Sequence, residues 1–220
     1  MKPEGAIPWC TKPRVVLCLG AHADDIEIGC GASLLQFLAR DPDREVVWVV
    51  FSASGVRRRE ARQSAQAFLQ SAARKRIVMR NFRDSYFPYC GERIKEFFET
   101  LKQQCDPDLI FTHYRDDWHQ DHRLISELTW NTWRSHCILE YEIPKYEGDW
   151  GTPNTFVPVP SEVAQRKVAL LLERFPSQRG RQWFSAETFL SVMRLRGMEC
   201  RVEAGYAEAF YGRKVLLAIE

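Results

Sequence analysis

The chain has 220 residues, of which 45% are hydrophobic, so it can bury one sizeable core, and a single domain spanning residues 1–220 is expected. Lysine and arginine total 31 against 29 aspartate and glutamate, and this net charge of +2 excludes a global attraction to nucleic acid or to membranes. No apolar run reaches the roughly 18 residues of a membrane span and residues 1–13 lack the features of a signal peptide, so we expect a soluble, cytoplasmic protein.

The first half of the chain alternates apolar runs with amphipathic segments. Residues 14–19 form a short apolar run that predicts a strand, and a helix is predicted from about Gly31 to Arg40. The order repeats, with strands predicted at residues 45–51, 76–79 and 108–112 and helices at 57–72, 92–104 and 121–133. Four strand–helix units in series predict an α/β fold with a Rossmann-like, doubly wound, mostly parallel sheet and helices on both faces.

The second half of the chain is less regular. A fifth strand is predicted at residues 137–143, helices at 161–174 and 185–196, and a closing strand at 214–219. Residues 144–160 contain several prolines and glycines and are expected to form a loop. Because this loop is longer than most connections in compact domains, we expect it to shape a substrate cleft.

Two groups of histidine and aspartate follow the first and the fourth predicted strands. The groups are His22, Asp24 and Asp25 in the first loop and His119, Asp121 and His122 in the second. In an open sheet of order 3-2-1-4-5, these two strands flank the point where the winding reverses, and ligands bind outside their carboxyl ends. The six side chains are therefore expected to meet in one site.

The spacing within these groups suggests a divalent metal centre. His22 and Asp25 are three positions apart, as are His119 and His122, so the members of each pair can share one face of a helical turn. A set of two imidazoles and one carboxylate leaves a coordination position open for water, as catalytic Zn²⁺ sites require. Fe²⁺, Mn²⁺ and Co²⁺ accept the same ligands.

The remaining side chains of the two groups suit the hydrolysis of an amide. A metal lowers the pKa of its bound water to about 7, and Asp24 is the candidate to take the proton of that water. Whichever of His119 and His122 is not a ligand can stabilise the oxyanion and protonate the leaving amine. Asp121 can raise the pKa of that histidine and select its tautomer.

Several segments carry a resemblance to a known family. They are His22-Ala-Asp-Asp25, Asp117-Trp-His-Gln-Asp-His122, and the segments at residues 59–63, 107–113, 150–154 and 207–210. On these segments the chain resembles, over nearly its whole length, the PIG-L (LmbE-like) family of metal-dependent N-deacetylases, whose motifs are His-Pro-Asp-Asp and His-x-Asp-His. Ala23 stands where the family's proline is usual, which removes a rigid backbone angle but no coordinating atom. Asp117 stands where some members have a tyrosine.

The resemblance implies an LmbE-like fold and a role for each motif residue. It implies that His22, Asp25 and His122 bind Zn²⁺, that Asp24 is the general base, and that His119 stabilises the oxyanion and acts as general acid. It also implies that Arg57, near the start of the second helix, and Asp84, after the third strand, contact the substrate. The implied reaction is the de-N-acetylation of an N-acetylated amino sugar or of its conjugate.

Three other functions are alternatives to this one. An amidase that cleaves a larger acyl group or a thiol conjugate would use the same residues. A non-catalytic sugar- or nucleotide-binding protein would have no need of Asp24, a carboxylate beside the metal that is not a ligand. A dinucleotide-binding oxidoreductase would carry Gly-x-Gly-x-x-Gly after the first strand, which this chain lacks. The partner is therefore expected to be a small molecule, and the sequence is compatible with a homo-oligomer.

Other residues near the two motifs have two interpretations each. Arg57, Arg58 and Arg59 lie at a helix N-terminus, where cations oppose the helix dipole, so at least one, with Arg62, is expected to bind a hydroxyl-rich or anionic substrate. The aromatic residues Tyr86, Trp118, Tyr146 and Trp150 are expected either to stack on a sugar ring or to pack in the core. His113 lies outside both motifs and is expected to be a structural or surface histidine.

Overall fold

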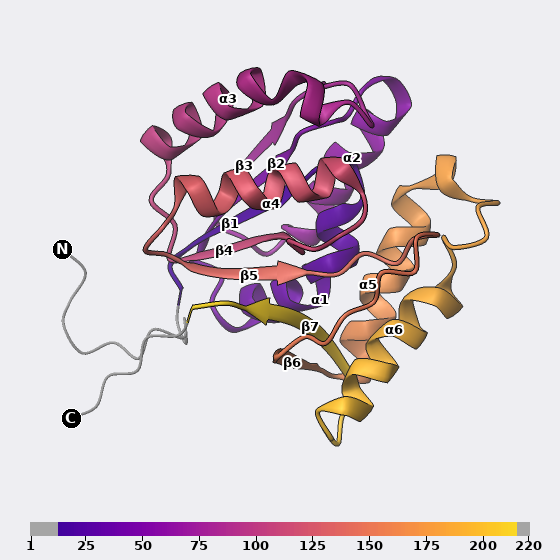
Figure 1. The fold of residues 1–220 in the computed structure, drawn as a ribbon. Coiled ribbons are helices and arrows are strands. Elements are labelled where there is room, and N and C mark those ends of the chain that lie inside the picture. The colour runs from indigo at the N-terminus through magenta and orange to yellow at the C-terminus, as the bar shows by residue number, and fades with distance from the viewer. Residues whose placement is uncertain (1–12, 215–220) are drawn as a thin grey trace, which may run out of the picture.

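The computed structural model describes residues 13–214, which form one seven-stranded sheet with helices on both faces (Figure 1). The strands are β1 (Val15–Gly20), β2 (Glu45–Val50), β3 (Arg74–Met79), β4 (Leu109–His113), β5 (Cys137–Tyr141), β6 (Thr155–Val159) and β7 (Tyr206–Gly212). The α-helices are α1 (Asp25–Arg40), α2 (Gly55–Phe68), α3 (Gly91–Gln104), α4 (Gln120–Thr132), α5 (Ser161–Arg174) and α6 (Ala186–Glu199). Two short 3₁₀ helices are η1 (Phe87–Cys90) and η2 (Pro176–Gln178).

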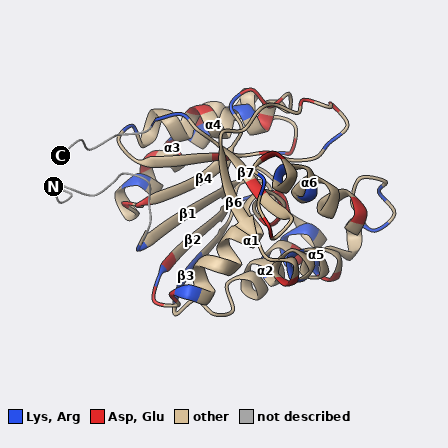
Figure 2. Ribbon diagram, turned by 90° about the horizontal axis from the view of Figure 1, so that it is seen from below, with Lys and Arg blue, Asp and Glu red and all other residues tan. Residues whose placement is uncertain are grey.

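The strand order is β3-β2-β1-β4-β5-β7-β6, and the first five of these strands are parallel. Strand β7 runs antiparallel to both β5 and β6. Helices α3 and α4 cover one face of the sheet, and α1, α2 and α5 lie on the other (Figure 2). This arrangement confirms the predicted doubly wound, mostly parallel α/β fold. None of the helices within residues 13–214 combines the length and the apolarity that a membrane span needs.

The core consists of two apolar layers, one on each face of the sheet, and β1 shows how the sequence builds both. Its alternate residues Val16 and Cys18 pack in the layer beneath α1 and α2, whereas Leu17 and Leu19 pack in the layer beneath α3 and α4. Successive side chains of a strand point to opposite faces, so a strand covered on both sides must be apolar throughout. The continuous apolar run of β1 therefore places it in the centre of the sheet.

Helix α1 is interrupted at Cys30, whose backbone angles are φ −140° and ψ 15°. The preceding residue, Gly29, lies against the ring of Tyr141, and a Cβ atom at position 29 would be 2.2 Å from Tyr141 Cδ2. Only glycine permits this close approach of helix and strand. The segment before the interruption begins with Asp25, so its direction determines where that carboxylate lies.

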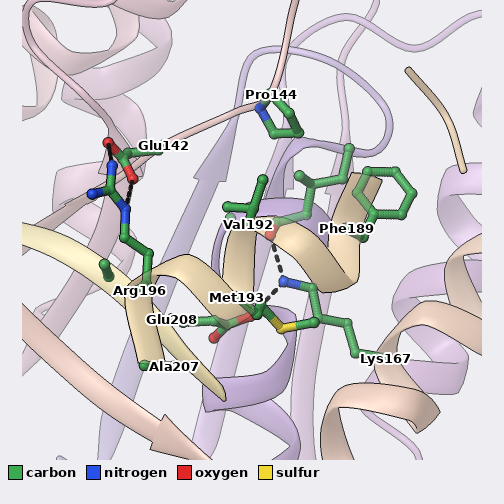
Figure 3. A pocket seen from close by; sticks show the side chains of 12 residues that line it. Glu142, Pro144, Lys167, Phe189, Val192, Met193, Arg196, Ala207 and Glu208 are labelled. Atoms are coloured by element: carbon green, nitrogen blue, oxygen red, sulfur yellow. Dashed lines mark hydrogen bonds and ion pairs between the residues drawn. The ribbon is translucent and has the colours of Figure 1, made fainter. Parts of the chain in front are cut away.

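A buried ion pair supplies the hydrogen bonds that the interruption of α1 removes. In a continuous helix the Ile28 carbonyl would accept a hydrogen bond from the Ala32 amide. Here Lys167 Nζ donates to Ile28 O at 2.6 Å, while the carboxylate of Glu208 accepts from the amides of Ala32 and Ser33 at 2.8 and 2.7 Å. The Lys167 and Glu208 side chains are 2.7 Å apart at the edge of a pocket between α1, α5 and α6 (Figure 3). Residues from α5 and β7 thus complete a helix at the other end of the chain.

Three sequence predictions differ from the structure. Helix α1 begins at Asp25, so the prediction for residues 31–40 covers only the segment after Cys30. Residues 144–160, expected to be a loop, include β6, an edge strand that tolerates Pro158 because a proline there need not donate to a second neighbour. Strand β7 was not predicted, since Glu208 interrupts its apolar pattern. The predicted strand at 214–219 lies, apart from its first residue, outside the described residues.

Replacement of Glu208 by glutamine is expected to destabilise the fold strongly. Glu208→Gln leaves the Lys167 ammonium buried without its anionic partner, and removing one member of a buried pair costs about 3 kcal/mol or more. Urea unfolding would measure the loss. The matched control is Glu99→Gln, because Glu99 pairs with Lys95 on the exposed surface of α3 and its loss should leave the midpoint unchanged. Equal midpoints for both variants would contradict the assigned role of the buried pair.

Candidate metal centre and active site

The candidate site lies where the carboxyl ends of β1 and β4 meet. These strands are parallel neighbours, and β1 ends at Gly20 while β4 ends at His113. A Cβ atom at position 20 would be 2.9 Å from Ile26 Cγ1, so glycine is needed for the tight turn into α1. The loop after β4 leads into α4, which begins at Gln120. The two predicted groups of histidine and aspartate are therefore brought to the same edge of the sheet.

Three atoms from the two motifs face a common point. His22 Nδ1 is 3.1 Å from His122 Nε2 and 3.5 Å from Asp25 Oδ2, and His122 Nε2 is 3.7 Å from Asp25 Oδ2. Donor atoms that bind one tetrahedral zinc ion at about 2.1 Å are roughly 3.4 Å apart. The spacing and the nitrogen and oxygen chemistry of this set fit a divalent cation.

Other acids and histidines surround these three atoms closely enough to form overlapping sets. His119 forms such a set with His22 and His122, His113 forms one with Asp25 and His122, and Asp84 forms one with His22 and Asp121. In each set the possible ligand atoms lie within 4.8 Å of one another. Each of these sets could hold a metal ion.

The ring of His22 is held between the centre and two carboxylates. Its Nδ1 faces Asp25 and His122, whereas its Nε2 is 3.3 Å from Asp121 Oδ2 and 3.2 Å from Asp84 Oδ1. Burial alone would lower the pKa of His22, but its hydrogen bonds to Asp121 and Asp25 raise that pKa well above its usual value. A carboxylate on the outer nitrogen of a ligating histidine orients the ring and increases its basicity.

The carboxylate of Asp121 contacts the ring of His22, a contact that the sequence did not predict, and the predicted support of His119 comes from the charge and the backbone of Asp121. Its two oxygens accept hydrogen bonds from the amides of Ser85 and Phe87 at 2.7 and 3.0 Å. His119 instead receives the backbone N–H of Asp121 on Nδ1, at 3.3 Å. Burial and the charge of His22 lower the pKa of His119, although Asp121 acts in the opposite direction. The carboxylate of Asp121 contacts His22 because Asp121 lies in the first turn of α4, which directs its side chain toward the first loop.

Asp24 is a buried carboxylate with one paired and one unpaired oxygen. Its Oδ1 accepts from Arg57 Nη2 at 2.8 Å, whereas Oδ2 has no hydrogen-bond partner within residues 13–214. Burial raises the pKa of Asp24, and the charge of Arg57 opposes this rise. Arg57 itself lies over the ring of Phe175 and near Glu60, so its guanidinium holds the carboxylate of Asp24 in place. A fixed carboxylate with a free oxygen can accept a proton from water.

Asp84 lies at the exposed side of the cluster. Its side chain is 68% exposed, and its hydrogen bond with His22 lowers its pKa to about 2. The carboxylate therefore combines an anchored oxygen with access to solvent. This position is compatible with the predicted contact to a substrate.

Asp117 belongs to the cluster, although sequence reasoning considered that position only as the replacement of a tyrosine. Its Oδ2 is 3.0 Å from His122 Nδ1, and its Oδ1 accepts from the His119 amide at 2.7 Å. Burial alone would raise the pKa of Asp117, but the hydrogen bond with His122 and the charge of Lys145 hold it well below its usual range. The signal in the sequence was an aspartate two positions before the second motif, in a loop that follows a strand.

His113, the last residue of β4, packs directly on the cluster. It is fully buried, its Nε2 accepts from the Ala21 amide at 2.9 Å, and the same nitrogen is 3.2 Å from Asp25 Oδ2. Its ring stacks on His122 with centroids 3.9 Å apart. His113 is therefore buried, not on the surface, and its ring packs against His122, one of the three converging residues.

The aromatic residues near the motifs are all on the surface. Among the large hydrophobic side chains that are exposed are Trp118 at 66%, Tyr146 at 72%, Trp150 at 49% and Tyr86 at 41%. They lie in the segments that follow β3, β4 and β5. The expectation that they pack in the core is therefore wrong.

The doubly wound sheet and the histidine–aspartate cluster at its switch point define the class of α/β proteins that bind a ligand at the carboxyl ends of their strands. The family model described as GlcNAc-PI de-N-acetylase (PIG-L) matches residues 17–133, and the chain belongs to this family of de-N-acetylases. The resemblance noted in the sequence is thereby confirmed.

Similar proteins agree with the family and also show how widely the fold is used. "Uncharacterized deacetylase YaiS" of Escherichia coli K12 is 28% identical over 172 residues, which are 73% of this chain and 90% of that protein. The N,N'-diacetylchitobiose deacetylase of Pyrococcus horikoshii superposes with a TM-score of 0.71 at 21% identity, covering 91% of this chain and 84% of that one. The 4-carboxy-2-hydroxymuconate hydratase GalB of Pseudomonas putida KT2440 gives 0.68 at 15% identity, covering 94% and 99%. At such identities the likeness establishes the fold, and the reaction must be argued from the site.

Replacing each histidine of the second motif in turn is expected to show which of the two binds the metal. His122→Ala should lose bound metal, because its Nε2 faces His22 and Asp25, whereas His119→Ala should retain it. Metal content after dialysis, measured by atomic emission, checks this. Loss of metal from His119→Ala but not from His122→Ala would show that His119 is the ligand and His122 is not.

Proposed function

We propose that this chain is a metal-dependent de-N-acetylase that converts an N-acetylated amino sugar, or a conjugate of one, to acetate and a free amine. The observation that carries the proposal is the convergence of His22, Asp25 and His122 beside Asp24, whose Oδ2 has no partner among the described residues. Membership of a de-N-acetylase family supports the reaction. The name of the P. horikoshii relative supports an acetylated amino sugar as the substrate class.

We infer that His22 Nδ1, Asp25 Oδ2 and His122 Nε2 hold the cation. Zinc suits two imidazoles and a carboxylate, and Fe²⁺, Mn²⁺ and Co²⁺ are the alternatives. When bound, the cation polarises the acetyl carbonyl and makes the attacking water more acidic. Asp121 and Asp117 hold the outer nitrogens of the two histidines, so that their inner nitrogens face the centre.

Asp24 is proposed to act as the general base. Its Oδ1 is occupied by Arg57, which leaves Oδ2 to take a proton from the attacking water as the hydroxyl adds to the acetyl carbon. That proton can pass to the nitrogen of the leaving amine as the C–N bond breaks. One water is then consumed, with its hydroxyl in acetate and its proton on the amine. Arg57 is consequently proposed to position the base, and any contact of Arg57 with the substrate stays a prediction.

His119 is proposed to stabilise the oxyanion. Its Nδ1 accepts the backbone N–H of Asp121, so a neutral ring carries its proton on Nε2 and can donate it in a hydrogen bond to the developing negative charge. The further role of general acid, which the family resemblance implies for His119, stays a prediction. Asp121 thus serves His119 through its backbone and His22 through its carboxylate.

The surroundings of the cluster favour a sugar over a simple aliphatic amide. Trp118 adjoins His119 in sequence, and Tyr86 lies two residues after Asp84, so two exposed aromatic residues lie close along the chain to residues of the cluster. Aromatic faces stack on the C–H faces of sugar rings, and an exposed carboxylate such as that of Asp84 accepts hydrogen bonds from hydroxyl groups. An amidase for a larger acyl group would use the same centre, so the acyl preference is left to a panel of substrates.

Replacement of the proposed base is expected to abolish turnover without loss of metal. Asp24→Asn keeps the size of the side chain but removes the proton acceptor, so kcat for acetate release from N-acetylated sugars should fall by about 100-fold or more. Acetate release and metal content would be measured on the same samples. Asp116→Asn is the matched control, since Asp116 is exposed in the second loop and lies outside the cluster. An Asp24→Asn enzyme that keeps its metal and full activity would refute the mechanism.

Loss of an exposed ring beside the site is expected to weaken substrate binding. Trp118→Ala should raise KM for an N-acetylated sugar by roughly five- to tenfold, which corresponds to about 1 kcal/mol of ring contact, and should leave kcat nearly unchanged. Steady-state kinetics would show this effect. Leu195→Ala removes an exposed hydrophobic side chain of α6 instead and should leave both constants unchanged. An unaltered KM in Trp118→Ala would argue against a stacked sugar at this position.

A further inference from the structure

We propose that Lys145 is a positioning residue of the metal centre and acts through Asp117 on His122. The proposal rests on the proposed metal-binding function, but it concerns a residue outside both histidine–aspartate motifs. Lys145 lies in the segment between β5 and β6, which the sequence suggested would shape the cleft. The structure instead directs this side chain toward the loop that carries the second motif.

A continuous chain of hydrogen bonds runs from Lys145 to the centre. Lys145 Nζ is 2.9 Å from Asp117 Oδ2, and the same oxygen is 3.0 Å from His122 Nδ1. The opposite nitrogen of that ring, Nε2, faces His22 and Asp25. Because a carboxylate on the outer nitrogen orients a ligating histidine, the ammonium that holds the carboxylate also determines the direction of the inner nitrogen.

The burial of the pair makes this contact stronger than a surface ion pair. Asp117 is 1% exposed and the side chain of Lys145 is 13% exposed. In such surroundings the attraction between opposite charges is screened weakly, and a carboxylate without its cation would be a buried, unpaired charge. Without Lys145, the carboxylate of Asp117 is expected to turn toward solvent or to be displaced by water.

A displaced carboxylate would affect both histidines of the second motif. The other oxygen of Asp117 accepts a hydrogen bond from the His119 amide at 2.7 Å. The side chain of Asp117 therefore orients the ring of His122 and also holds the backbone of His119. Lys145 controls this side chain from a different loop.

Lys145 also makes a second contact, which provides a rival explanation. Its Nζ is 2.6 Å from Asp149 Oδ1, and Asp149 Oδ2 accepts from the Trp118 amide at 2.7 Å. Lys145 could thus serve only to tether its own segment to the second loop. The two explanations differ in which acid matters, since a tether depends on Asp149 whereas positioning of His122 depends on Asp117.

The test compares metal binding by the full-length wild-type protein and by Lys145→Met, with Zn²⁺ and Co²⁺ as the probes. Competition with a chelator gives the Kd for Zn²⁺, and the visible absorption of bound Co²⁺ reports the ligand geometry. Loss of the carboxylate on a ligating histidine typically costs 10–100-fold in metal affinity, so displacement of Asp117 in Lys145→Met is expected to raise the Kd for Zn²⁺ by up to about that factor and to change the Co²⁺ spectrum. Lys145→Arg, which keeps the cation, should recover part of the affinity.

Matched variants separate positioning from other effects. Lys95→Met removes a lysine from an ion pair in α3 and should bind Zn²⁺ like the wild type. Asp149→Asn removes the tether but leaves the contact between Lys145 and Asp117, and should raise the Kd much less than Lys145→Met does. Thermal unfolding would confirm that the variants fold, and Lys145→Gln would take the place of a methionine variant that does not.

Two results would overturn the proposal while leaving the proposed function intact. One is a wild-type Kd and Co²⁺ spectrum in folded Lys145→Met, and the other is an equal rise of the Kd in Asp149→Asn. A wild-type protein that binds neither Zn²⁺ nor Co²⁺ would overturn the metal centre itself and the positioning role with it. The failure of each hypothesis is therefore recognised separately.

Discussion

The buried ion pair between Lys167 and Glu208 is the interaction on which the geometry of the site depends. It provides the hydrogen bonds that α1 loses at Cys30, and so it holds the first segment of that helix at an angle that a continuous helix could not take. Asp25 begins this segment. The desolvation of two charges is offset because the pair bonds both to each other and to backbone groups that would otherwise be unpaired. The last described strand thereby directs a loop that lies near the start of the chain.

Within the site, too, residues of one segment orient the functional side chains of another. Asp121, from the second loop, holds His22 of the first loop, while Asp117 holds His122 and is itself held by Lys145. Each proposed ligand histidine thus has one nitrogen toward the centre and the other on a carboxylate. Such outer partners restrict the rings to one orientation before a metal binds, which reduces the entropy lost on binding.

The fold alone does not decide the reaction. A hydratase and a deacetylase share this architecture with the chain at similar TM-scores, so the chemistry must reside in side chains at the switch point. In this chain the group proposed to decide it is Asp24, a buried carboxylate whose Oδ1 pairs with Arg57 and whose Oδ2 has no hydrogen-bond partner among the described residues. The proposed contact with a sugar depends on the exposed aromatic residues of the neighbouring loops.

The sequence by itself determined the parallel half of the sheet, because the continuous apolar runs of β1 and β2 suit strands that are buried on both faces. It also placed the two motifs at strand ends, and strand order then implied that they meet. Only the tertiary structure decided which carboxylate supports which histidine, where α1 begins, and that Glu208 lies in a strand. The reason is that the buried carboxylates of Glu208 and Asp117 are stabilised by lysines that are distant in the sequence. Local sequence patterns predict which apolar side chains are buried. The pairing of buried charges depends on contacts between distant segments, which form only when the chain folds.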